Sequence, residues 1–454
     1  MSIAFSSGKL QGEERRKVLQ AVQKQAKVAA CAAIKGVLEA FLEAEVSTKL
    51  GREKRESRRI SGEPRTIDWQ CGYCGCRNTQ QFIRDGHYRR DLATGWGLVR
   101  DLRVPMLECQ VCQHDVVSHF ALLEKHHRFW MDLDQNVLFG SGFGESLRQI
   151  QERWSATVEG SVGLRTLNER INQIEPLAKQ AHREPISEVP PIIQLDGIWV
   201  TIISQQEPIR PDKRKRKRKT RTGRKMVILV ALGFWPDGRR EILDWQMARG
   251  EDHQEWEGLV QRLWERGRQP ERGLQLVVRD GSGGLGEALA LVYGTSVPEQ
   301  RCIFHKLQNV ATKCRSELKD KEKRDVRKQL MEQAAAVYHA ENAEEARKRL
   351  TGWAKQWCEQ APQAVATLER DFEQTLVFYT IAGLAPQWLR TTSLLEPPIG
   401  AFRRKFRQAV TFGSHAGAEV ALYLQVRRLH ARWGRQRWWE TSQTIFFDFW
   451  NLNP

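Results

Sequence analysis

The chain has 454 residues, which is enough for about two to four domains and at least one large buried core. Its formal net charge of +17 indicates a polyanionic partner, either a nucleic acid or an acidic membrane surface. No apolar run approaches the roughly 18 residues of a membrane span, and the opening MSIAFSSGKL lacks a signal peptide's apolar stretch. Nine cysteines in so long a chain are typical of metal binding and exclude a disulfide scaffold, so we expect a cytoplasmic protein.

Residues 1–66 are predicted to form an N-terminal helical region. From about residue 12 to residue 50, apolar side chains recur at the spacing of one helical stripe. The stripe is formed by Ile34, Val37, Leu38, Phe41 and Leu42. A polar, arginine-rich stretch follows and ends this region at about Thr66.

A compact cysteine-bearing module is predicted over residues 67–120. Its knuckles are Cys71-x-x-Cys74 and Cys109-x-x-Cys112, and four thiolates from two such knuckles form a closed tetrahedral zinc site. Between them, residues from His87 to Pro105 alternate in polarity, as short strands and turns do. We therefore predict a zinc ribbon with one structural Zn²⁺. Two further residues of the module are alternative ligands, Cys76 and His114.

A second helical region is predicted over residues 121–186. The apolar pattern from Ser146 to Ile171 indicates two or three short helices with a break at Gly160. This arrangement suits a helix-turn-helix-like DNA-binding domain. Three prolines between Glu184 and Pro191 indicate a linker to the next domain.

From residue 187 the pattern changes to that of an α/β domain. Strands are predicted over 192–203, 225–235, 240–247, 274–279 and 299–303, with helices after the third and fourth strands. The turn Pro236-Asp237-Gly238 joins the second and third strands as a hairpin. Three antiparallel strands followed by helix, strand, helix and strand is the order of an RNase H-like core.

The α/β core is predicted to be interrupted by helices. Its first part covers residues 187–305, and residues 306–388 form an all-helical insertion rich in Ala, Glu, Lys and Arg. Residues 389–454 then supply the final core helix and further C-terminal helices.

Two aspartates in the predicted strands indicate metal chemistry. Asp196 lies inside the first strand of the core and Asp280 ends the fourth. A carboxylate in an apolar strand needs a partner or a cation, and two carboxylates on adjacent strands repel unless a divalent metal bridges them. This geometry suits two-metal phosphoryl transfer with Mg²⁺ or Mn²⁺. The alternative is that each aspartate caps a turn, because Asp-Gly is a common turn signal.

A Cys-x-x-His pair, Cys302 and His305, follows the last predicted strand. It could be half of a zinc site, for which Cys314 is the only nearby additional ligand. It could also be a packed cysteine and a hydrogen-bonded histidine that brace the metal carboxylates. We favour the bracing role.

The order of these motifs resembles the Mutator-type transposases of bacterial insertion sequences. The motifs that carry this resemblance are Asp196-Gly197, Asp237-Gly238, Asp280-Gly281 and Gln300-Arg301-Cys302 with His305. The N-terminal part is similar too, in Leu42–Val46, Leu50-Gly51, Arg89-Arg90 and Val104-Pro105. The resemblance spans about residues 35 to 435, and its sharpest piece is the Cys-x-x-His pair. The cysteine knuckles have no counterpart in it, so we interpret the ribbon as an insertion.

The resemblance also implies a third acid, a glutamate in a Thr-Thr-Asn-x-x-Glu context. Thr391, Thr392 and Glu396 fit this pattern, with Ser393 in place of the asparagine. Pro397 and Pro398 depart from it and predict that Glu396 lies at a helix start. Alternative third acids are Glu369, Asp371 and Glu373.

Basic residues predict contacts with DNA phosphates. From Arg210 to Lys225 there are eleven Lys or Arg against one acidic residue, Asp212, and such a tract is expected to order on phosphates. The expected DNA-binding residues are Lys213, Arg214, Lys215, Arg216, Lys217, Arg218, Lys219, Arg403 and Arg404. A solvated loop is the alternative for the tract.

The resemblance implies a DNA transposase that cleaves insertion-sequence ends and transfers the freed strand to target DNA. One Mg²⁺ or Mn²⁺ pair, held by Asp196, Asp280 and Glu396, would serve both steps. Two double-stranded ends must be handled together, so we expect a homodimer or larger assembly, associated with the bacterial nucleoid. The alternatives are a domesticated zinc-ribbon DNA-binding protein that no longer cuts, and an RNase H-like nuclease.

Overall fold

The structure is a computed structural model that describes residues 12–56, 70–116, 120–123, 127–158, 160–186, 188–202, 224–320, 323–408 and 415–452. The chain divides into two compact units. Unit 1 consists of Met1–Ser141, Glu145–Ile171 and Ser442–Pro454, and unit 2 of Gly142–Gly144 and Asn172–Thr441. Across the residues described, no helix is both long enough and apolar enough to cross a membrane.

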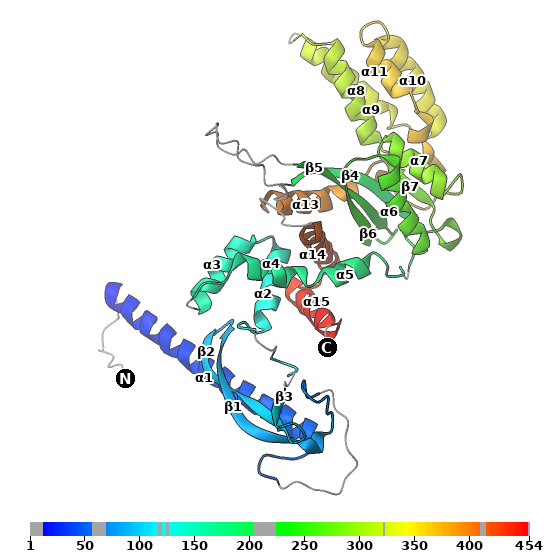
Figure 1. Cartoon of the computed structure of the whole chain (residues 1–454). Coiled ribbons are helices and arrows are strands. Elements are labelled where there is room, and N and C mark those ends of the chain that lie inside the picture. Colours follow the sequence, from blue (N-terminus) through cyan, green and yellow to red (C-terminus); the bar gives the residue numbers. More distant parts are fainter. Residues whose placement is uncertain are drawn as a thin grey trace, which may run out of the picture. The chain divides into compact units, whose positions relative to one another are not determined.

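Unit 1 is built on one long helix that lies along an antiparallel sheet (Figure 1). The helix is α1 (Gly12–Leu50), which confirms the helix expected over residues 12–50. The sheet has the order β1-β2-β3, with β1 (Phe82–Thr94), β2 (Gly97–Cys109) and β3 (His114–Val116). A short 3₁₀ helix, Thr79–Gln81, precedes β1.

The face of α1 that packs on the sheet differs in part from the expected stripe. Leu38, Leu42 and Val46 are buried at a spacing of four residues, whereas Val37 is 70% exposed and Phe41 is 46% exposed. The buried leucines pack on apolar side chains of the two long strands. A window with apolar residues on two neighbouring helical faces does not show which face meets the sheet, because that depends on the partner surface.

The hairpin of β1 and β2 is longer than the expected short strands, at thirteen residues in each strand. It closes where Thr94 pairs with Gly97. Gly97 has a φ of +138°, and a Cβ there would lie 2.7 Å from the Lys27 side chain. The turn therefore needs glycine both for its backbone conformation and for its close approach to α1.

Four short helices follow: α2 (Asp132–Phe143), α3 (Leu147–Val158), α4 (Leu164–Asn172) and α5 (Glu175–Ala181). Gly160 lies between α3 and α4, as expected. Within unit 1, Arg170 of α4 forms a buried ion pair with Asp134 of α2 at 3.1 Å.

The centre of unit 2 is a five-stranded sheet with the order β6-β5-β4-β7-β8. Its strands are β4 (Ile192–Ile202), β5 (Arg224–Phe234), β6 (Arg240–Ala248), β7 (Leu276–Arg279) and β8 (Glu299–Arg301). β4, β5 and β6 pair antiparallel, and β7 and β8 add to β4 in parallel. All five expected strands are present, in the topology of an RNase H-like core.

Alternate residues of the central strands pack on different layers. Ile193 and Leu195 of β4 pack with α6 (His253–Glu265) and α7 (Gly283–Val292). Ile192 of β4 instead shares a core with Leu276, Val278 and a set of helices. Because side chains alternate along a strand, Asp196 points to the same face as Ile192.

Helices α8 to α11 form a lobe at one end of this sheet (Figure 1). They are α8 (Ile303–Glu317), α9 (Arg324–Val337), α10 (Ala343–Trp357) and α11 (Pro362–Glu369). Four later helices complete the chain: α12 (Pro386–Leu389), α13 (Glu396–Gln408), α14 (His415–Trp433) and α15 (Trp438–Leu452). Short 3₁₀ helices lie at Pro270–Arg272, Glu373–Thr375, Val377–Thr380 and Ser393–Leu395.

Candidate functional site

The two predicted aspartates lie side by side on adjacent parallel strands, Asp196 within β4 and Asp280 directly after the end of β7. β4 and β7 pair in parallel with Leu195 opposite Arg279, so the next residues along each strand are Asp196 and Asp280. Asp196 is only 8% exposed, and Asp280 is half-buried. The sheet therefore brings the two aspartates together where β7 ends beside β4, as their positions in the sequence predict.

Local hydrogen bonds hold both carboxylates in place. The Gly197 amide donates to Oδ1 of Asp196 at 2.8 Å, and the Thr392 hydroxyl lies 3.2 Å from Oδ2. The Ser282 amide donates to Oδ1 of Asp280 at 2.9 Å. Burial raises the pKa of Asp196, the Asp280 charge raises it further, and His305 opposes both. This is the electrostatic situation that a bound cation relieves.

Cys302 and His305 lie beside the aspartates. Burial raises the pKa of Cys302, but the interactions with His305 and with the Thr392 amide together outweigh it, and the net shift is downward. The pKa of His305 is raised to about 9, first by Cys302 and then by Asp196 and Asp280. Cys314 is instead buried in the core of the helical lobe. The arrangement therefore favours the bracing role for the pair over half a zinc site.

The segment before α13 is docked over β4. Gln194 Nε2 donates to the carbonyls of Trp388 and Thr391 at 3.1 and 3.0 Å. The Thr392 amide lies 3.4 Å from the Cys302 sulfur. Thr392 thus contacts both Asp196 and Cys302, a role that the sequence signals only through the Thr-Thr motif.

Glu396 is the first residue of α13, as the following prolines predict. Its side chain is exposed, and among the described residues no hydrogen bond or ion pair joins it to the site. The alternative third acids are also exposed, and two of them are paired elsewhere: Asp371 with Arg301 at 2.6 Å and Glu373 with Arg347 at 2.7 Å. The structure thus places Glu396 close in sequence to the docked Thr-Thr motif but does not bring its carboxylate into the aspartate pair.

A further acid, Glu251, lies at the aspartate pair. A Cβ on Gly197 would collide with Oε1 of Glu251, and a Cβ on Gly284 would lie 2.7 Å from the Glu251 carbonyl. Burial raises the pKa of Glu251, and the charges of Asp280 and Asp196 raise it further. The sequence contains only an indirect signal for this position, in the two glycines that allow the approach.

These groups fit a hard divalent cation. Carboxylate oxygens are the preferred ligands of Mg²⁺ and Mn²⁺. Nδ1 of His305 is buried and has no hydrogen-bond partner among the described residues, which leaves a polar atom free for a metal-bound water or another ligand. Asp196 and Asp280 supply such oxygens with Glu251 beside them, but among the described residues only the four knuckle cysteines have ligand atoms that all lie within 4.8 Å of one another. Glu396 lies exposed at the start of α13.

The four knuckle cysteines of unit 1 come together in a second cluster. Their sulfur atoms all lie within 4.8 Å of one another, with 3.4 Å between Cys71 and Cys112 and 3.6 Å between Cys74 and Cys109. The backbone amide of Cys74 makes the largest contribution in lowering the pKa of Cys71 to about 6. A set of four thiols at this spacing fits Zn²⁺.

The alternative ligands of this cluster serve other purposes. The Cys76 side chain packs against the apolar core of the module and is not among the four clustered thiols. His114 lies 2.7 Å from the Cys112 carbonyl through Nδ1 and stacks on Tyr73.

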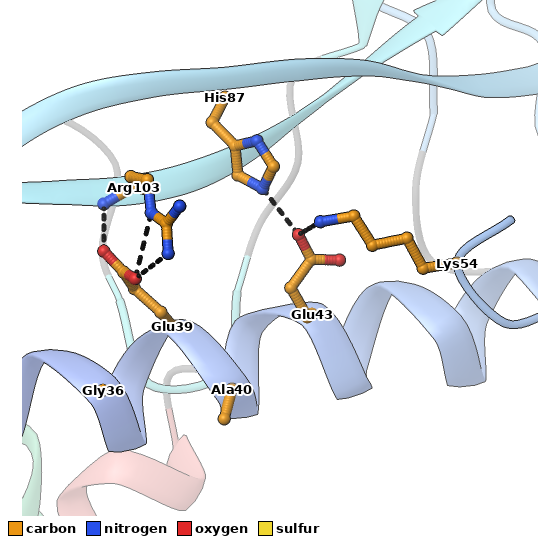
Figure 2. A pocket seen from close by; sticks show the side chains of 7 residues that line it. All are labelled: Gly36, Glu39, Ala40, Glu43, Lys54, His87 and Arg103. Carbon is orange, nitrogen blue, oxygen red and sulfur yellow. Dashed lines mark hydrogen bonds and ion pairs between the residues drawn. The ribbon is translucent and has the colours of Figure 1, made fainter.

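A pocket of about 330 Å³ in unit 1 lies between α1 and the hairpin (Figure 2). Figure 2 shows His87 and Lys54 converging on the Glu43 carboxylate, at 2.6 and 3.1 Å. The Glu39 carboxylate accepts a hydrogen bond from Nη2 of Arg103 at 2.7 Å. Acidic and basic groups balance within the pocket, so its role is to fasten α1 to the hairpin.

The predicted DNA-binding residues fall into two groups. Lys213 to Lys219 lie outside the described residues. Arg403 and Arg404 are exposed on α13, and Arg404 lines a pocket in unit 2.

Comparisons with known proteins agree on one family. A family model described as "Transposase, Mutator family" matches residues 9–436. The chain is 25% identical over 424 residues to the transposase for insertion sequence element ISRM5 of Rhizobium meliloti (strain 1021), covering 91% of this chain and 90% of that protein. It is 25% identical over 377 residues to the transposase for IS905 of Lactococcus lactis subsp. lactis (strain IL1403), covering 80% and 85%.

Among solved structures, the Drosophila P element transposase strand transfer complex matches with a TM-score of 0.34 and 9% identity. The match covers 67% of this chain and 93% of that chain. The fold assignment rests on the strand order of unit 2 and not on this weak likeness.

Proposed function

The chain belongs to the Mutator family of transposases, and we propose that Asp196, Asp280 and Glu396 hold a pair of Mg²⁺ or Mn²⁺ ions for DNA cleavage and strand transfer at insertion-sequence ends. The observation that supports this most is that two aspartates lie side by side on adjacent parallel strands of an RNase H-like sheet, one within β4 and one directly after β7. Carboxylates placed against each other repel unless a cation lies between them.

The residues around Asp196 and Asp280 orient the carboxylates and balance their charge for metal binding. When bound, the ions activate the attacking oxygen and stabilise the leaving 3′-oxygen. Thr392 and Gly197 orient the Asp196 carboxylate through hydrogen bonds. Cys302 packs against Thr392, and His305 offsets part of the negative charge on the aspartates. Glu396 reaches the site from α13, in a movement of its side chain or of the start of the helix when DNA binds.

The other predicted parts have supporting roles in this proposal. The four knuckle cysteines bind one structural Zn²⁺ that fixes the end of the hairpin. The partner is double-stranded DNA, bound in part by the Lys213–Lys219 run and by Arg403 and Arg404. Two DNA ends are joined in one reaction, so the working form is a dimer or a larger assembly.

The test is cleavage of a plasmid that carries the element's own flanking DNA. Wild-type protein should cut and join strands with Mg²⁺ or Mn²⁺, and bind without turnover in Ca²⁺. Asp196→Asn, Asp280→Asn and Glu396→Gln keep the side-chain size but remove the charge that binds metal. Each should keep DNA binding and lose both reactions, and double variants should be no worse than singles because the three act as one unit.

Two further amide variants, Glu251→Gln and Glu369→Gln, test which acid is the third metal ligand. Glu251 neighbours the aspartates, so its amide should lower the rate by about 10- to 100-fold. Glu369 is exposed at the end of α11, and its amide should leave the rate unchanged.

If Glu396→Gln cut normally while Glu251→Gln did not, the third ligand would be Glu251. If both aspartate amides cut normally, the metal assignment would be wrong. Wild-type protein that binds DNA without any cleavage would favour the domesticated DNA-binding protein. Wild-type protein that cleaves DNA but does not join the strands would favour the RNase H-like nuclease.

A further inference from the structure

A second pocket, in unit 2, concentrates positive charge. It has a volume of about 210 Å³ and lies where α13 and α14 meet residues 142–144. Arg404 and Lys405 of α13 and Arg428 and Arg432 of α14 line it. None of the lining residues is acidic. Three guanidinium groups therefore converge on one small cavity without a carboxylate among its walls.

The fold sets this convergence through helix geometry. Arg428 and Arg432 are four residues apart on α14, so they project from the same face one turn apart. Like charges at this spacing destabilise a helix slightly, so the folding of α14 alone does not account for the pair. Arg404 is exposed on α13, while Lys405 beside it is 7% exposed.

Arg428 is held in a fixed position at the pocket wall. Its Nη1 donates to the Gly142 carbonyl at 3.0 Å, and its guanidinium carbon lies 4.6 Å from the centre of the Phe143 ring. Gln425 Nε2 donates to the same carbonyl at 3.0 Å. A guanidinium fixed in this way loses little conformational entropy when it binds a ligand.

The electrostatics of the pocket favour an anion. Burial lowers the pKa of Arg428, and the charges of Arg404 and Arg432 lower it further. Two other arginines of the described chain face acids, in the pairs of Arg170 with Asp134 and Arg239 with Glu188. An anion in the pocket would relieve the repulsion among the three guanidinium groups.

We propose that this pocket binds a backbone phosphate of the DNA that is cut. Guanidinium forks match the oxygens of a phosphodiester, and several of them define one phosphate position. Arg404 lies eight residues after Glu396 on α13, or about 12 Å along the helix axis, so the bound phosphate would be close to the reacting strand. The inference rests on the proposed function, since it takes the DNA substrate as the ligand.

The test compares two double variants that each remove two positive charges. Arg404→Gln with Arg432→Gln alters the pocket through exposed side chains, and Arg435→Gln with Arg437→Gln alters two exposed arginines after α14 that do not line it. Affinity for a DNA duplex of arbitrary sequence, about four helical turns long, is measured over a series of KCl concentrations. The pocket variant should bind about tenfold more weakly, with a salt slope smaller by about one. The control should change the affinity by no more than about threefold.

Equal weakening by the two variants, or no weakening by the pocket variant, would overturn the proposal. A free phosphate ion is the other source of the same chemistry. If inorganic phosphate raised the melting temperature of the wild type but not of the pocket variant at matched ionic strength, while both variants bound DNA equally, the ligand would be that ion. Failure of the proposed function appears differently, as a wild type that does not cut DNA with Mg²⁺, whatever the pocket variants do.

Discussion

His182, in unit 2, is held between two carboxylates. Its Nδ1 lies 2.5 Å from Asp244 and its Nε2 lies 2.8 Å from Glu419. Both ring nitrogens must donate to satisfy the two acids, so the ring is a cation. Burial lowers the pKa of His182, but the two carboxylates outweigh this and raise it to about 9.

His182→Gln should therefore destabilise unit 2 in a pH-dependent manner. The pKa of the folded state is above the ordinary value of 6.5, so the stabilisation is full below pH 6.5 and is lost as the pH rises through about 9. We expect a loss of about 3 kcal/mol in the free energy of unfolding at pH 6, which shrinks as the pH rises from 6.5 and is nearly gone above pH 9. Urea unfolding at several pH values measures it, with His415→Gln as a control at an exposed histidine. A pH-independent difference would contradict the ion-pair account.

The positions of single site residues were predictable to different degrees. Asp196 and Asp280 could be paired from the sequence, because a charge in an apolar strand is unusual and the strand order makes β4 and β7 neighbours. Glu251 could not, since it follows β6 in a loop and reaches the site only where Gly197 and Gly284 leave room. Its placement depends on contacts between segments far apart in the chain, which no local pattern records.

At the scale of elements, the cysteine module depends on two turns rather than on a core of its own. Cys71 and Cys74 lie before β1, and Cys109 and Cys112 lie at the end of β2 and in the turn after it. Purified protein should contain close to one zinc per chain. Cys71→Ser with Cys109→Ser should lose it and melt at a lower temperature, because metal binding contributes directly to the folding of such sites.

Elemental analysis with thermal melting measures this. Cys358→Ser is the matched control, since that cysteine is exposed and distant in sequence from the cluster. Wild-type protein without zinc, or a double variant that keeps it, would contradict the ribbon.

The elements themselves were largely predictable, and their partners were not. Apolar periodicity located α1 and all five strands of the unit 2 sheet to within a few residues. The same periodicity assigned Val37 and Phe41 to the buried face of α1, although they are exposed. It also indicated short strands where the hairpin has two long ones. Both differences come from tertiary packing: α1 supports the hairpin, and the hairpin selects which face of α1 is covered.

At the scale of the whole molecule, the net charge of +17 depends heavily on one tract. Replacing each residue from Lys213 to Lys219 with Ser removes positive charge throughout the run and should weaken binding to all DNA sequences alike. The slope of log affinity against log salt should flatten by about 0.9 for each phosphate that the tract no longer neutralises. Exchanging every Lys for Arg and every Arg for Lys in the run keeps the charge and should change neither quantity. An unchanged slope in the Ser variant would identify the tract as a solvated loop.

The central claim is that Asp196 and Asp280 together bind divalent metal, and Mn²⁺ binding tests it most directly. Electron paramagnetic resonance follows free Mn²⁺ as it is titrated into the full chain bound to duplex DNA, with the signal of DNA alone subtracted. We predict that wild-type protein takes up Mn²⁺ and that Asp196→Asn and Asp280→Asn each weaken this binding by at least about tenfold. Both variants binding Mn²⁺ as tightly as the wild type would contradict the account.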